Sequence, residues 1–242
     1  MNPIVKKLAL LLVVLLFLST NAGATTIFSV SGLYQGVSSG VVLGGLFETV
    51  VAQSWTMSTG FSGVSISVPL STGLTGEPAL IKAFLVNQIG PGTTVANQVA
   101  SSSFSVSNSE FAPAQTTIFS GLDLGPGTYY LVLTGFPQTP TNDQGDWHDS
   151  GGDGTATVTF GPGVTTPGWF GTTTTPQTGV DLSYAPASTF RNNSDPFFGF
   201  VTGPFIDVDA NTPEPSSLSM FIVAFMALAG LRAQRLGRRR TR

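Results

Sequence analysis

The chain of 242 residues contains no cysteine and only one histidine, His148. The absence of thiols excludes disulfide bonds, cysteine nucleophiles and metal sites built on cysteine. Charged residues are also scarce, at 10% of the chain. A domain of this composition has to be held together by its hydrophobic core, and the chain is long enough to bury a sizeable one.

Basic residues almost disappear once the two chain ends are set aside. Between residues 25 and 212 only Lys82 and Arg191 are basic, against twelve acidic residues, which gives this stretch a net charge of −10. So few cations cannot neutralise a phosphate backbone or bind anionic headgroups. The sequence therefore predicts no nucleic-acid partner.

The N-terminus has the three parts of a secretory signal peptide. Lys6 and Lys7 precede an apolar run over residues 8–18, and Ala22-Gly23-Ala24 supplies the small residues that a signal peptidase requires. We expect residues 1–24 to be removed during export by signal peptidase. The remaining chain then begins at Thr25.

The C-terminus combines a short motif, an apolar segment and a basic end. Pro213-Glu214-Pro215 precedes an apolar run over residues 218–231, which is followed by six arginines, among them Arg238, Arg239 and Arg240. Basic residues beside an apolar span stay in the cytoplasm, so this end is expected to lie in the inner membrane. The run spans about 21 Å as a helix, whereas a hydrocarbon core is about 30 Å thick, which favours a processed label over a permanent anchor.

This arrangement resembles the PEP-CTERM sorting signal of Gram-negative bacteria, which is handled by the membrane enzyme exosortase. The resemblance covers about the last thirty residues. It implies an inner-membrane-tethered precursor whose mature form reaches the cell envelope or the extracellular space. Proteins with this signal commonly occur in bacteria that make exopolysaccharide, so it also implies a structural or adhesive role in that matrix. An ordinary single-span C-terminal anchor is the alternative.

The middle of the chain has the pattern of β-strands. Residues 61–70 alternate, with Val64, Ile66 and Val68 on one face, and residues 103–107 repeat the pattern. In residues 51–58, Trp55 falls on the face expected to be buried. The runs 80–86 and 129–133 are apolar on both faces, and Gly-Pro turns separate such segments.

We therefore expect an all-β fold, an antiparallel β-sandwich, flanked by an N-terminal signal helix and a C-terminal transmembrane helix. The expected divisions are a signal peptide (1–24), a β-sandwich body (25–206), a linker (207–212) and a sorting signal (213–242) with its transmembrane segment (218–231).

A Pro-Gly turn at Gly125-Pro126-Gly127 leads into a strand that opens with Tyr129 and Tyr130. This segment resembles the tyrosine corner of immunoglobulin-like sandwiches, in which the phenol bonds back to the preceding loop. Residues 53–134 are also similar to the small jelly-roll-like domains appended to secreted bacterial proteases and glycosidases. Those domains often hold calcium on an acidic pair before the central strand, but this chain has Ala79-Leu80-Ile81-Lys82 there.

Two polar patterns could carry chemistry. A Gly-rich stretch contains carboxylates of the kind that Ca²⁺ prefers, but their spacing does not match an EF-hand loop, and an acidic turn is the alternative. These carboxylates are Asp143, Asp146, Asp149 and Asp153. Residues 36–40 fit Gly-x-Ser-x-Gly with Ser38 at the centre, but no helix is expected after it and His148 is the only available base.

The third pattern is aromatic. Trp147 and Trp169 lie in sequence typical of loops, with Phe170 beside the second, and exposed indoles can stack on sugar rings. The alternative is that both rings close the core from its edge. We therefore predict a protein that is not an enzyme and has no cofactor or metal site, with a carbohydrate-binding module as the second hypothesis. A glycan-active hydrolase using Asp146 and Asp149 is the third.

Overall fold

The computed structural model describes residues 24–32, 40–44, 50–72, 78–107, 113–135, 144–148, 156–172, 184–192 and 203–211. Nearly all of them belong to one compact unit, Thr25–Ala210. Within this described part, no helix has the length and apolar character needed to cross a membrane. The expected signal peptide and the sorting signal with its transmembrane segment lie outside the described residues, apart from Ala24.

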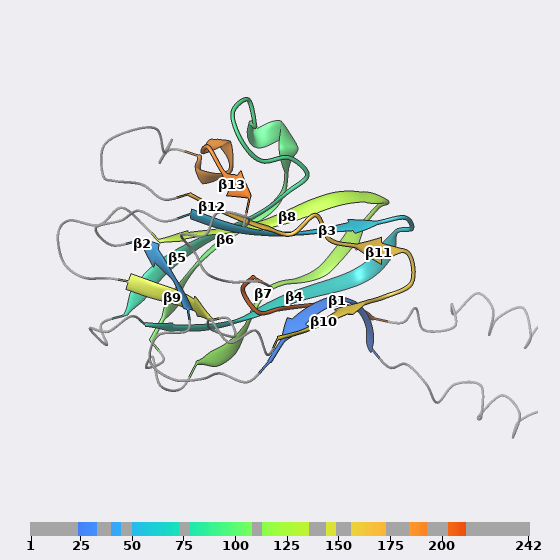
Figure 1. The fold of residues 1–242 in the computed structure, drawn as a ribbon, viewed down its shortest axis with the longest axis horizontal. Coiled ribbons are helices and arrows are strands. Elements are labelled where there is room, and N and C mark those ends of the chain that lie inside the picture. Colours follow the sequence, from blue (N-terminus) through green and yellow to red (C-terminus); the bar gives the residue numbers. More distant parts are fainter. Residues whose placement is uncertain are drawn as a thin grey trace, which may run out of the picture. The chain divides into compact units, whose positions relative to one another are not determined.

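The body is all-β, as predicted, and consists of two antiparallel sheets (Figure 1). Sheet A has the strand order β10-β1-β14-β4-β9-β2, and β7 pairs with β4. Its strands are β1 (Ala24–Ser31), β2 (Gly40–Gly44), β4 (Phe61–Thr72), β7 (Ala114–Leu124), β9 (Gln144–His148), β10 (Thr157–Phe160) and β14 (Ile206–Asn211). The long strand β4 organises the sheet, because β7, β9 and β14 all pair with it.

Sheet B has the strand order β13-β12-β3-β8-β5-β6, and β11 pairs with β3. Its strands are β3 (Val50–Met57), β5 (Ala79–Val86), β6 (Gln98–Val106), β8 (Gly127–Gly135), β11 (Val164–Thr165), β12 (Trp169–Thr172) and β13 (Arg191–Asn192). The helical structure in the described residues is limited to two single 3₁₀ turns, Val95–Asn97 and Ala185–Ala187.

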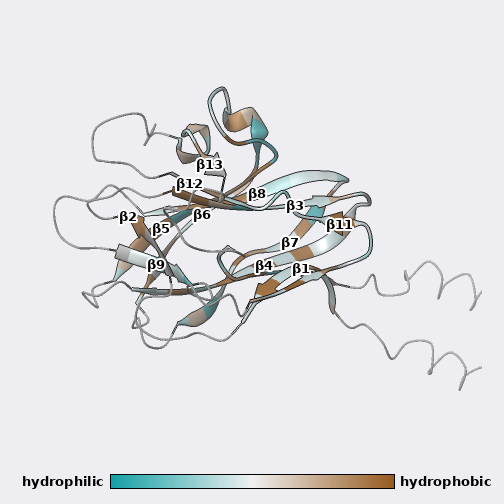
Figure 2. Ribbon diagram, viewed as in Figure 1, coloured by the Kyte–Doolittle hydropathy of each residue, from teal (hydrophilic) through white to brown (hydrophobic). Residues whose placement is uncertain are grey.

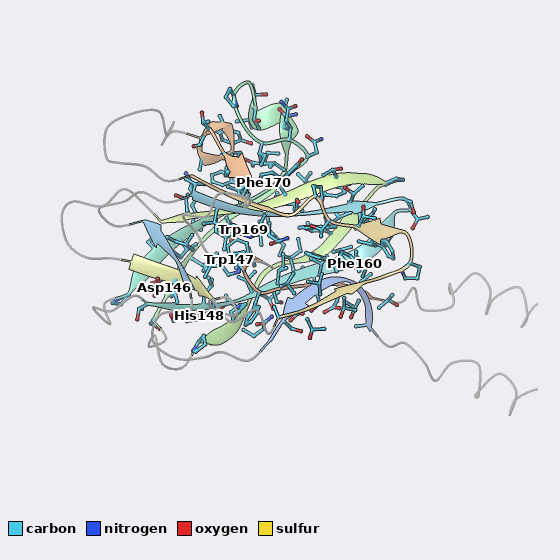
Figure 3. All side chains as sticks on the ribbon, in the orientation of Figure 1. Asp146, Trp147, His148, Phe160, Trp169 and Phe170 are labelled. Atoms are coloured by element: carbon cyan, nitrogen blue, oxygen red, sulfur yellow. The ribbon has the colours of Figure 1, made fainter. Side chains whose placement is uncertain are left out.

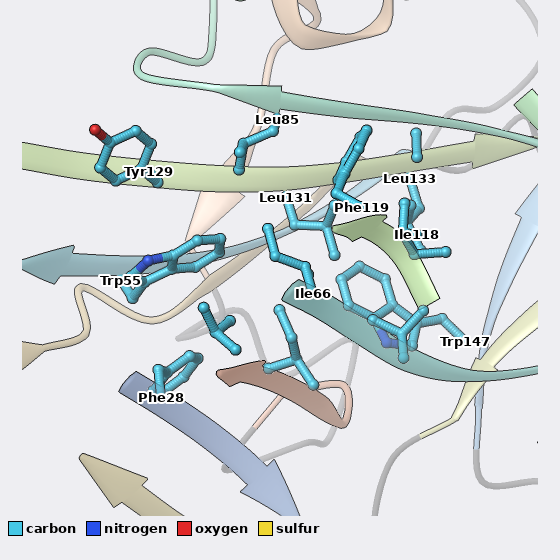
Figure 4. Packing of buried hydrophobic residues seen from close by; sticks show 14 of the residues in the cluster. Phe28, Trp55, Ile66, Leu85, Ile118, Phe119, Tyr129, Leu131, Leu133 and Trp147 are labelled. Carbon is cyan, nitrogen blue, oxygen red and sulfur yellow. The ribbon is translucent and has the colours of Figure 1, made fainter. Parts of the chain in front are cut away.

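The alternation expected from the sequence positions the core. Along β4 the side chains of Val64, Ile66, Val68 and Leu70 are fully buried, while the serines between them lie on the outer face. Trp55 in β3 is fully buried, as predicted. The hydrophobic stretches of Figure 2 accordingly lie in strands of both sheets, and the side chains in Figure 4 fill the space between them.

A row of aromatic rings connects the two sheets through the core. Phe28 of β1 stacks on Phe160 of β10 at 5.7 Å between ring centroids and on Trp55 at 6.3 Å. Trp55 in turn stacks on Tyr129 of β8 at 6.1 Å. Offset aromatic contacts at this spacing stabilise beyond the area they bury, so this row fixes how sheets A and B pack (Figure 4).

The tyrosine corner is confirmed. The Tyr129 hydroxyl donates a hydrogen bond of 3.0 Å to the carbonyl oxygen of Gly125, in the turn just before β8. Gly127 has a φ of 152°, a backbone angle that residues with a side chain rarely adopt, so this tight turn needs a glycine there. Tyr130 points to the opposite face of β8 and takes no part in the corner.

The predicted linker was wrong in its position. Residues 207–211 belong to β14, which pairs with β4 from Asp207 opposite Ser67 to Ala210 opposite Val64. Ile206, Val208 and Ala210 face the core, and the two aspartates between them face outward. Aspartate and asparagine are depleted in strands, so the composition resembled a linker although its period of two is that of a strand.

Candidate functional site

The two tryptophans predicted to be exposed in loops are instead buried in strands. Trp147 lies in β9 with none of its surface exposed, and its indole nitrogen donates to the carbonyl oxygen of Phe205 at 2.7 Å. Trp169 lies in β12 and is 1% exposed. Figure 3 shows both side chains between the sheets, while Phe170 points the other way. Stacking on a sugar needs an exposed ring face, so the exposure on which this ligand-binding hypothesis rested is wrong.

The acidic stretch is not a single exposed turn either. Asp146 is a buried residue of β9, directly opposite Ser71 of β4. Asp143, Asp149 and Asp153 lie outside the described residues. In the part of the chain that the structure describes, no three histidine, aspartate or glutamate side chains gather where they could hold a metal ion.

The only histidine forms a buried hydrogen bond. His148 Nε2 lies 2.6 Å from the Ser71 hydroxyl, and both side chains are at most 2% exposed. The carbonyl oxygen of His148 also accepts from the backbone N–H of Phe205 at 2.8 Å. A serine nucleophile has to reach its substrate, so this buried pair acts as a cross-strand link between β4 and β9. Ser38 lies outside the described residues.

The outer face of sheet A is polar, and its side chains bond to one another. Asp207 accepts from the Ser29 hydroxyl at 2.6 Å and from the Gln115 amide at 2.9 Å. Ser67 and Thr117 pair across β4 and β7 at 3.0 Å. The hydroxyls, the amide and the carboxylate of this face are thus used in bonds to one another.

The outer face of sheet B is aromatic. We define the aromatic patch as the partly exposed rings of Tyr130, Phe170, Tyr184 and Phe190, which pack on a second hydrophobic cluster outside the main core. Tyr130 and Phe170 lie 6.0 Å apart in a tilted arrangement. Tyr184 meets the buried ring of Phe84 edge-on at 5.5 Å. The patch therefore collects rings from β8, β12 and the segment 184–190 around one buried cluster.

Charge is divided between the two sheets. The aspartates in the described residues, Asp123, Asp146, Asp207 and Asp209, all belong to strands of sheet A. The basic residues of the same part, Lys82 and Arg191, belong to strands of sheet B. Lys82 Nζ lies 5.6 Å from the centroid of the Phe84 ring, within range of a cation–π contact. The cation thus lies beside Phe84, the ring that Tyr184 of the aromatic patch meets edge-on.

Two phenols on the body differ in their hydrogen bonds. Burial raises the pKa of both Tyr129 and Tyr184 above the ordinary value of 10.0. Tyr129 donates to Gly125, whereas the buried Tyr184 hydroxyl has no hydrogen-bond partner among the described residues. The sequence could have indicated that Tyr130 lies on the outer face of its strand, because it follows the inward-facing Tyr129. It had no signal for Tyr184 and Phe190, which come from a distant segment.

Comparisons with protein-family models, with curated proteins and with solved structures found no match to this chain. The candidate site therefore rests on the chemistry of the aromatic patch alone.

Proposed function

We propose that the protein is exported and serves as a non-enzymatic component of the cell surface or extracellular matrix, with a structural or adhesive role beside exopolysaccharide. In this proposal the body is a jelly-roll-like sandwich, and the newly made chain carries a signal helix before it and a transmembrane helix after it. Signal peptidase and exosortase act on the two ends. The inner-membrane-tethered precursor then becomes a mature form at the envelope or outside the cell.

The observation that carries this proposal is where the body ends. The last strand of sheet A stops at Asn211, and Pro213 opens the motif Pro213-Glu214-Pro215 two residues later. A folded unit followed at once by a short motif, an apolar segment and arginines is the arrangement expected of cargo with a sorting label. The buried His148–Ser71 bond supports the non-enzymatic part, because the only histidine is used for packing.

Expression in the native host tests the label. The wild-type chain should be recovered from the envelope or the medium, and mass spectrometry should find a C-terminus near Pro213 in place of Arg242. A chain that carries Arg238→Ala, Arg239→Ala and Arg240→Ala together should accumulate unprocessed, because arginines hold this end in the cytoplasm. Peptides ending at Arg242 as the dominant mature form would make the segment a plain anchor.

A carbohydrate-binding module is the second candidate, and the aromatic patch favours it. Partly exposed rings are flat apolar platforms, which suits stacking on sugars. The neighbouring Lys82 would suit an acidic polysaccharide in a body that is otherwise anionic. The hydrolase hypothesis is weaker, because the Asp146 side chain is buried in β9.

Retention on an exopolysaccharide gel separates these candidates. Phe170→Ala should reduce retention if the aromatic patch binds sugar, because it removes one stacking platform. Phe160→Ala is the matched control, since Phe160 is 45% exposed but lies on sheet A. Equal loss in both variants, or no retention of the wild-type protein on any glycan, would leave only the structural role.

A further inference from the structure

The edges of the two sheets are protected unequally. The strand β7 at one edge of sheet A carries Asp123 and has several register shifts along β4, and β10 is only four residues long. The edge strands β11 and β13 of sheet B have two residues each. Charges, irregular pairing and short length all hinder the addition of another strand.

The strand β6 has none of these protections. It is nine residues long, reads Gln-Val-Ala-Ser-Ser-Ser-Phe-Ser-Val, and contains neither proline nor a charged residue. Its pairing with β5 is regular from Val106 to Ala100, and the single shift comes at the opposite end near Gln98. Sheet B ends at β6, and no described residue pairs with its outer side. Among the described residues, a regular stretch of seven residues therefore forms an unpaired edge of sheet B.

Exposed apolar side chains gather at this edge. In the described part of the chain the large hydrophobic side chains that remain exposed are Leu80, Val95, Val99 and Phe160. Val99 lies in β6 and is 42% exposed, Val95 lies in the turn just before it and is 68% exposed, and Leu80 lies beside Ser105 on β5. Three of the four thus border β6, which is typical of a surface that a partner covers.

We propose that β6 pairs with β6 of a second copy of this chain, antiparallel and about a two-fold axis at Ser103, so that two sheets B become one continuous sheet. The charges favour this occupant. A body of net charge −10 repels its own copy, and every described aspartate lies in sheet A. The β6 edge lets two copies meet where no described carboxylate lies.

The register follows from matching the faces of the two sheets. The inner faces of both sheets must lie on the same side of the continuous sheet, which requires a two-fold axis perpendicular to it. Such an axis places one residue of β6 opposite the same residue of the second copy. Centring the regular stretch on Ser103 places Ser101 opposite Ser105 of the second copy. Within the stretch from Ala100 to Val106, only serines then meet across the exposed face, because Ser101, Ser103 and Ser105 point outward. This pairing does not depend on the proposed function.

Single cysteines test the register, since the chain has no thiol of its own. Opposed residues of an antiparallel pair have Cα atoms about 4.5 to 5.5 Å apart, within the range of a disulfide. We expect the full-length Ser103→Cys protein to form a covalent dimer on mild oxidation, seen on a non-reducing gel. The Ser105→Cys protein alone should form at least about tenfold less covalent dimer, because residue 105 of one copy and residue 105 of the other lie about 13 Å apart along the strands.

A mixture of the Ser101→Cys and Ser105→Cys proteins should cross-link with each other. Ser120→Cys is the matched control, an exposed serine on the edge strand β7 of sheet A, and should stay monomeric. Equal cross-linking at Ser120 would mean that contact between copies is unspecific, for example through their C-terminal segments. Failure of Ser103→Cys to cross-link, or a maximum at Ser105, would overturn the proposal.

A charge variant provides a test that needs no oxidation. Ser103→Lys places like charges opposite each other at the proposed axis, on an exposed position that the fold does not need. The sedimentation coefficient of the full-length protein should fall from that of a dimer to that of a monomer, with an unchanged circular dichroism spectrum. Ser120→Lys on β7 should leave the dimer intact, and a dimer that survives Ser103→Lys would contradict the pairing.

Discussion

Sheets A and B share one core, but their outer faces differ. The outer face of sheet A is polar and bonded within itself, as in the contacts of Asp207 with Ser29 and Gln115. The outer face of sheet B is apolar, and the segments 87–97 and 184–190 lie above it (Figure 1). A hydrogen bond of 2.9 Å from the Gly90 N–H to the Pro186 carbonyl oxygen joins these two segments.

The difference follows from how the strands are patterned. A strand that alternates, such as β4, needs a core on one side only and leaves its serines in water. The strands β5 and β8 are apolar on both faces, so their second face also has to be covered. Sheet B therefore supports two hydrophobic clusters, and the aromatic patch combines rings of its strands with rings of the covering segment 184–190.

Replacing a tryptophan of the shared core should have the largest effect. Trp147→Ala removes a fully buried ring and its hydrogen bond to Phe205, so it should lower the free energy of unfolding by about 3 to 5 kcal/mol. Urea unfolding followed by fluorescence measures this. An unchanged urea midpoint would indicate that the Trp147 side chain is exposed, as predicted from the sequence.

The outer faces of the two sheets should respond unequally to substitution. Phe84→Leu loosens the second cluster of sheet B and its edge-on contact with Tyr184, and should cost about 1 to 2 kcal/mol. Ser67→Ala removes only an exposed pair with Thr117 on sheet A and should cost less than about 0.5 kcal/mol. Similar losses in both variants would show that the sheet B cover is not a second core.

Two tyrosine-to-phenylalanine variants compare the stability contributed by hydroxyls in the inner and outer clusters of sheet B. Tyr129→Phe loses the bond to Gly125 and should cost about 1 kcal/mol. Tyr184→Phe deletes a buried hydroxyl that has no partner in the described part of the chain, so it should leave the melting temperature unchanged or raise it slightly. Calorimetry of both variants decides, and equal destabilisation would place an unseen partner on Tyr184.

The smallest expected effect is at alkaline pH. Burial raises the pKa of Tyr129 and Tyr184 above 10.0, so the folded state keeps their protons longer than the unfolded chain does. This contribution to stability is complete below about pH 10 and is lost as the pH rises through the raised values. Urea midpoints measured between pH 9 and 11 should therefore fall, and less steeply when both residues are phenylalanine.

Local patterns predicted the parts of the fold that depend on neighbouring residues. The alternation in β4 and the turn before Tyr129 are visible within about ten residues of sequence, and both were confirmed. Trp147 could not be placed in this way, because its partner Phe205 is 58 residues away and its surroundings are rich in Asp and Gly. The aromatic patch was missed for the same reason, since it joins Tyr130 to Tyr184.

The place of β14 in sheet A has a consequence for when the body can fold. The last strand of the body lies between β1, the first, and β4, and Ser29 bonds to Asp207 across 178 residues. A chain that emerges N-terminus first has a gap in the middle of this sheet until Asn211 appears. The sandwich is therefore completed only as residues 213–242 follow, so closure of the fold and arrival of the sorting motif are close together in time.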